Sequence, residues 1–141
     1  MILSLKAHVE YGSATVGLKV NYIENLLDGM SKYKLTEWKA SFGVRPIVCH
    51  ETWIMIQPKI SSSKTCLSIQ HFYWALFWMK TYPTESVAAR TLGTNAKTLR
   101  EKVGEMIRIL STSMPRVVGK YIFFISLFKK VTLIISFWHY Y

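Results

Sequence analysis

Six polar and basic side chains between residues 95 and 108 have the types and spacing of a helix surface that binds DNA. They are Asn95, Lys97, Thr98, Arg100, Lys102 and Arg108. Arginine and lysine neutralise phosphates or donate to guanine, and an asparagine amide pairs with adenine. We expect the first four to contact bases and the last two to contact phosphates. The chemistry that they predict is the binding of double-stranded DNA.

The acids and thiols of the chain do not have the pattern of a catalytic or metal centre. The eight acids are seven glutamates and Asp28, and no acid follows Glu105. Cys49 and Cys66 lack the C-x-x-C spacing that binds zinc. We expect both to be reduced thiols, with Cys49 half-buried on a helix. The sequence therefore predicts no catalytic residue, no metal ligand and no cofactor.

A short helix is predicted from Glu85 to Leu92. Thr84 is a suitable N-cap, and the negative charge of Glu85 suits the first turn of a helix. Gly93 can adopt the left-handed conformation that ends a helix. The side chains that we expect to face inward are Val87, Ala88 and Leu92.

A second helix is predicted over residues 96–111, with Asn95 as its N-cap. Its apolar positions recur every three or four residues, which is the spacing of one helix face. They are Leu99, Val103, Met106 or Ile107, and Leu110. The opposite face at the start of this helix is left to the polar side chains named above.

The spacing of small and aliphatic residues favours a helix-turn-helix at residues 84–111 over an ordinary helical hairpin. Ala89 is small where two helices approach, Gly93 follows four residues later, and Leu99 follows ten residues later. In DNA-binding motifs of this kind, the start of the second helix enters the major groove. Residues 80–120 also carry eight Lys or Arg against three Glu. A hairpin with a solvated basic face is the alternative.

Composition indicates a folded, intracellular domain with an affinity for polyanions. Half of the 141 residues are hydrophobic and 18% are charged, which is too apolar for a disordered chain. The formal net charge of +10 favours nucleic acid or an anionic membrane surface as a partner. The first residues lack the long apolar core of a signal peptide.

The upstream sequence predicts further helices that support this motif. We expect a turn at 11–15, a helix at 20–27 ended by Asp28-Gly29, and a helix at 31–42 ended by Gly43. Pro46 is predicted to open a helix that Pro58 ends, followed by a solvated loop over 59–64. Residues 67–80 predict a central buried helix. We interpret its aromatic residues as core rather than as a ligand site, and His71 as structural rather than catalytic.

Several short motifs of the sequence resemble those of a family of transposable-element proteins. The matching residues are Phe42-Gly43, Pro46, Val48-Cys49, Trp53, Trp74-Ala75-Leu76, Lys80, Tyr82, Thr84-Glu85, Gly93, Lys97-Thr98, Arg100 and Val103. In order and spacing they resemble the N-terminal region of Harbinger-like DDE-superfamily transposases. The resemblance implies a helical domain that binds element ends, ahead of a nuclease domain whose Asp, Asp and Glu hold two metal ions. No Asp or Glu follows Glu105 in this sequence. The resemblance therefore implies a chain that is truncated before the nuclease domain.

The hydrophobic tail at 119–141 leaves three interpretations open. It has the length of a membrane anchor, but Lys129-Lys130 near its middle would cost about 2.5–3.5 kcal/mol each. It is alternatively a hairpin or helix packed on the core, or aberrant sequence from an unspliced or frameshifted transcript.

Together these observations predict a mostly α-helical bundle of five or six helices. We expect a partly helical extension at 1–34, a DNA-binding domain at 35–118 and the tail at 119–141. The predicted function is that of a non-catalytic, nuclear DNA-binding module of a transposase-derived protein. The alternatives are a small basic membrane-associated protein anchored by the tail, and a helix-turn-helix regulator unrelated to transposons.

Overall fold

The computed structural model describes residues 3–113, and there the chain forms six helices and no strand. The helices are α1 (Leu5–Thr15), α2 (Lys32–Phe42), α3 (Pro46–Ser62), α4 (Ile69–Thr81), α5 (Glu85–Leu92) and α6 (Ala96–Ser113). The predicted fold class, a mostly α-helical bundle, is confirmed. The tail predicted at 119–141 lies outside the described residues.

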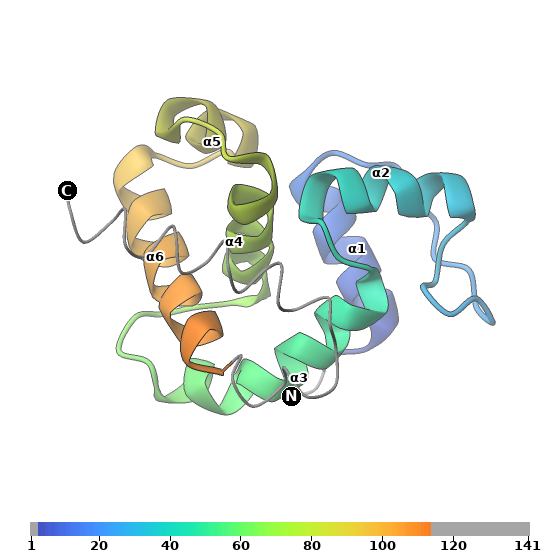
Figure 1. The fold of residues 1–141 in the computed structure, drawn as a ribbon, viewed down its shortest axis with the longest axis horizontal. Coiled ribbons are helices and arrows are strands. Elements are labelled where there is room, and N and C mark those ends of the chain that lie inside the picture. The colour runs from blue at the N-terminus through green and yellow to red at the C-terminus, as the bar shows by residue number, and fades with distance from the viewer. Residues whose placement is uncertain (1–2, 114–141) are drawn as a thin grey trace.

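Helix α4 is the centre of the bundle, as its sequence predicted. It packs against α1, α2 and α6, while α3 crosses one end of the bundle and contacts α1 and α6 (Figure 1). Five successive residues of α4, from Phe72 to Leu76, are buried. His71 has a local structural role, since its Nδ1 accepts a hydrogen bond from the backbone N–H of Ser68 at 3.0 Å. This bond satisfies a donor at the start of the helix.

The boundaries of α2 and the start of α3 follow the local signals in the sequence. Ser31 caps α2, with its hydroxyl accepting from the backbone N–H of Lys34. Gly43 ends α2 in the left-handed conformation at φ 76°, which a glycine adopts at little cost. Pro46 is the first residue of α3, where its missing N–H has no helical partner to lose.

Two predictions for the amino-terminal segment are wrong. Residues 11–15, expected to form a turn, belong to α1, which Ser4 caps and which packs on α3 and α4. Residues 20–27, expected to be helical, form a loop that is closed by the backbone hydrogen bond from Ile23 to Gly29. The loop is held from its far end, because Arg45 donates two hydrogen bonds to the buried carboxylate of Asp28, at 3.0 and 2.6 Å.

Helix α3 also departs from expectation at two points. It continues past Pro58 to Ser62, so residues 59–62 are helical and not a loop. A proline removes one helical hydrogen bond, but packing on both sides holds this one in place: Ile56 is fully buried and Lys59 donates to Thr112 of α6. Cys49, expected to be half-buried, is 1% exposed, and this burial raises the pKa of its thiol.

Candidate nucleic-acid interface

The turn between α5 and α6 has the geometry that its sequence predicted. Thr84 caps α5, with its hydroxyl accepting from the backbone N–H of Val87. Gly93 ends α5 at φ 69°, and the next N–H, that of Thr94, returns to the carbonyl of Ala89 at 2.9 Å. This is the hydrogen bond of a Schellman motif, and it turns the chain sharply. The result is two helices that are joined by only three residues.

Helix α6 begins at a side-chain cap that the sequence also predicted. The Oδ1 atom of Asn95 accepts a hydrogen bond from the backbone N–H of Thr98 at 2.8 Å. This contact satisfies one of the four N–H groups that a helix start leaves without a partner. Asn95 is exposed, whereas Thr98 is partly buried.

The apolar sides of α5 and α6 pack together much as predicted. Ala88, Ala89 and Leu92 of α5 are buried, and so are the predicted positions of α6, which are Leu99, Val103, Met106, Ile107 and Leu110. Helix α6 also packs on α4, so that α4, α5 and α6 form a three-helix unit. The prediction that Val87 faces inward is wrong, because its side chain is 49% exposed. It precedes Ala88 by one residue and so points about 100° away around the helix.

Lys97 and Arg100 lie exposed in the first two turns of α6. Within residues 3–113, Lys97 makes no ion pair or side-chain hydrogen bond. Arg100 is held by Glu85 at the start of α5: its Nε lies 2.8 Å from Oε1 and its Nη2 lies 2.7 Å from Oε2. The hydrogen bonds and charge of Arg100 lower the pKa of Glu85, and Glu85 raises the pKa of Arg100.

The two predicted phosphate contacts lie apart from this pair of residues. Lys102 is about 140° around the helix from Lys97, and its Nζ donates to the backbone oxygen of Cys66 at 2.7 Å. Arg108 is about 20° from Lys97 around the helix, but about 16 Å farther along it. It forms a two-pronged ion pair with Glu105, which also accepts a hydrogen bond from Ser63. The structure thus brings together Lys97 and Arg100, with Arg108 farther along the same side.

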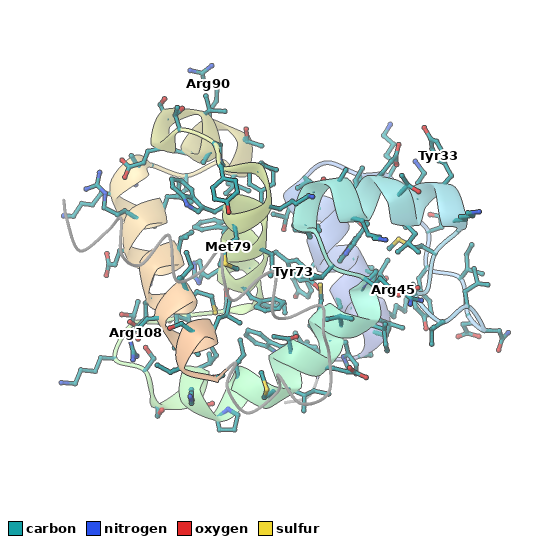
Figure 2. All side chains as sticks on the ribbon, viewed as in Figure 1. Tyr33, Arg45, Tyr73, Met79, Arg90 and Arg108 are labelled. Carbon is teal, nitrogen blue, oxygen red and sulfur yellow. The ribbon has the colours of Figure 1, made fainter. Side chains whose placement is uncertain are left out.

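One exposed cation was missed by the sequence analysis. Arg90 projects outward from α5 (Figure 2) and makes no ion pair within residues 3–113. The three other arginines of this range are each bound to a carboxylate: Arg45 to Asp28, Arg100 to Glu85, and Arg108 to Glu105. The signal that would have found Arg90 is the helical phase of α5, because burial of Ala88, Ala89 and Leu92 leaves position 90 facing solvent.

A second group of reactive side chains lies in the core, where α1, α3 and α4 meet. The Nδ1 of His8 and the hydroxyl of Tyr73 share a buried hydrogen bond of 2.8 Å, and the ring of His50 packs edge-on against His8. Figure 2 shows Tyr73 at the middle of the bundle. Burial, and then the charge of His50, lower the pKa of His8 to about 4. His8 and Tyr73 are buried in the protein interior and His50 is partly buried beside them, so we interpret the group as part of the core.

The part of the chain that the structure describes also bears on metal sites and on membrane-spanning helices. No cluster of three or more His, Cys, Asp or Glu residues there is arranged to hold a metal ion. None of the helices there combines the length and the apolar character needed to cross a membrane. Comparisons with protein-family models, curated proteins and solved structures gave no match to this chain.

Proposed function

We propose that this protein binds double-stranded DNA, with the start of α6 in the major groove and α5 crossing the phosphate backbone. The observation that carries the proposal is the pairing of a tight, Gly93-centred turn with an exposed basic start of α6. Lys97 at the start of α6 and Arg90 of α5 both lack a carboxylate partner within residues 3–113. They are therefore available to phosphates without the loss of an existing ion pair.

Packing on α4 and α5 holds α6 in a fixed orientation, as DNA recognition requires. A reading helix must be held rigidly, since base contacts depend on its orientation in the groove. The side of α6 that faces away from Lys97 is buried against α4 and α5 through Leu99, Val103 and Met106. Exposed contacts to DNA would then be made by a helix whose other side is fixed in the core.

The kind of DNA is suggested by the family resemblance in the sequence. We propose that the bound DNA is the end of a transposable element, that binding occurs in the nucleus, and that the described helices bind without cutting. The supporting feature is that Lys97, Thr98 and Arg100, which carry part of the resemblance, lie together in the first turns of α6. A regulator unrelated to transposons would need the same helix surface but not the same DNA.

Lys97→Ala tests the proposal against a matched change of charge elsewhere. The full chain is titrated into a labelled duplex of random sequence at several salt concentrations, and the affinity is followed by fluorescence anisotropy. We expect Lys97→Ala to weaken binding to all sequences and to reduce the slope of log K against log salt by about one. Lys6→Ala removes an exposed charge from α1 and is expected to change neither quantity. Equal behaviour of the two variants would contradict the proposal.

A further inference from the structure

The ion pair between Glu85 and Arg100 joins the two helices of the proposed interface through side chains that are partly exposed. Glu85 is the first residue of α5, and Arg100 lies in the second turn of α6. Their side chains are 37% and 55% exposed, so that both remain open to an approaching duplex. Glu85 is further favoured where it lies because negative charge suits the start of a helix.

The geometry of the pair leaves a specific edge of the guanidinium available. A guanidinium carries five N–H donors in one plane. Glu85 accepts from Nε and from Nη2, which leaves both N–H groups of Nη1 and the second N–H of Nη2. One N–H of Nη1 and the remaining N–H of Nη2 lie along one edge, and such an edge can donate to O6 and N7 of guanine together. The carboxylate meanwhile fixes the plane in which that edge lies.

The charge of the pair argues against a phosphate as the target of Arg100. The two charges cancel locally, so the pair adds little to the attraction of DNA of any sequence. A phosphate that approached Arg100 would also be repelled by the carboxylate of Glu85. A guanine edge carries no full charge and suffers less from this repulsion.

We propose that Glu85 is a positioning residue that sets base specificity, because it holds Arg100 ready to read guanine and keeps it from acting as a phosphate contact. The inference rests on the proposed function, since it names the chemistry that the same surface would recognise. Lys97 and Arg90 would supply the sequence-independent attraction, and Arg100 would supply discrimination.

The test compares base preference with charge-driven binding for the full chain. Wild type, Glu85→Gln, Arg100→Lys and Glu105→Gln are each used to select from a randomised duplex library, and each is titrated into random duplex at several salt concentrations. Glu105→Gln is the matched control, because it frees Arg108 from a similar ion pair nearer the C-terminal end of α6. Circular dichroism verifies that each variant is folded.

We expect wild type to enrich sequences with guanine at one position. In Glu85→Gln and Arg100→Lys, the preference for guanine over other bases at that position should fall by about tenfold. Glu85→Gln should bind random duplex several-fold more tightly, with a salt slope greater by about one. Glu105→Gln should keep the guanine preference.

Two results would overturn the inference for different reasons. If Glu85→Gln keeps the wild-type guanine preference, or weakens binding to all sequences equally, Glu85 is only structural and DNA binding itself stands. If wild type binds no duplex and enriches no sequence, the proposed function fails and this inference fails with it.

Discussion

At the scale of single residues, Asn95 combines a structural contact with a predicted reading contact. Its oxygen is already engaged by the N–H of Thr98, so only its amide nitrogen remains to donate to a base. An adenine contact that needs both atoms of the amide would have to share the oxygen with the cap. The sequence predicted both roles, and the structure shows that both would use the same oxygen.

Substitution of Asn95 separates these roles. Asn95→Ala should lower the free energy of unfolding by about 1 kcal/mol, because the N–H of Thr98 loses its side-chain acceptor. Asn95→Asp keeps an acceptor and should retain that stability, while its charge should weaken binding to duplex DNA. Urea denaturation and anisotropy titration measure the two effects. A variant Asn95→Ala as stable as wild type would rule out the capping contact.

His8 predicts how stability depends on pH. Its folded pKa of about 4 lies below the ordinary value of 6.5, so the unfolded chain binds more protons between these values and stability falls as pH falls. The free energy of unfolding should therefore fall by about 2 kcal/mol between pH 7 and pH 5. The physical reason is burial: Nε2 of His8 has no hydrogen-bond partner among the described residues, so a proton there would be poorly stabilised.

Urea denaturation at a series of pH values tests this effect against His8→Asn, whose amide can still hydrogen-bond to Tyr73. The variant should lose most of the pH dependence over this range. A smaller part should persist, because burial also lowers the pKa of His71. A pH dependence identical in the two proteins would show that His8 is not the responsible group.

At the scale of elements, the sequence predicted α5 and the start of α6 from signals at their own ends. Thr84, Gly93 and Asn95 each act through a contact within a few residues, and all three contacts are present. The segment at 20–27 failed because an apolar period does not form a helix without a surface to cover. Its Asn25 adopts φ 69° and its Leu27 is exposed. The loop is held by the contact of Arg45 with Asp28. Because Arg45 is distant in sequence, the residues of the loop alone could not predict this contact.

Helix α1 was missed for the opposite reason, because its glycine serves a contact rather than a turn. Gly12 is buried, and a Cβ atom at that position would overlap the ring of Trp38 and lie 2.9 Å from Tyr73. Glycine therefore allows α1 to approach α2 and α4 closely. Nothing in the local sequence distinguishes this use of glycine from a turn.

Substitution Gly12→Ala tests the close approach of α1. An added methyl group raises helix propensity, but here it must displace two buried aromatic rings, so we expect a net destabilisation of about 1–3 kcal/mol. Glu10→Ala, at an exposed position of the same helix, should change stability little. Thermal and urea denaturation of both variants provide the measurement. Stabilisation by Gly12→Ala would mean that α1 does not pack as described.

At the scale of the whole molecule, helix content and the central place of α4 followed from composition and hydrophobic pattern. The arrangement around α4 did not, because it depends on contacts between distant segments, such as His8 with Tyr73. The candidate interface was predicted as a set of residues on one helix. Its electrostatics were not, because the partners of Arg100 and Lys102 lie on other elements.

The division of the molecule around α4 makes the central claim directly testable. Helices α5 and α6 lie on one side of α4, and α1 and α2 lie on the other (Figure 1). DNA bound as proposed should contact the first side alone.

The decisive measurement is a map of amide chemical shifts in the isotope-labelled full chain as duplex DNA of random sequence is added. The account predicts that the largest changes fall within residues 84–101, including Arg90 and Lys97, while α1 and α2 stay unchanged. Shifts that cluster on α1 and α2, or a spectrum that duplex DNA leaves unaltered, would contradict it.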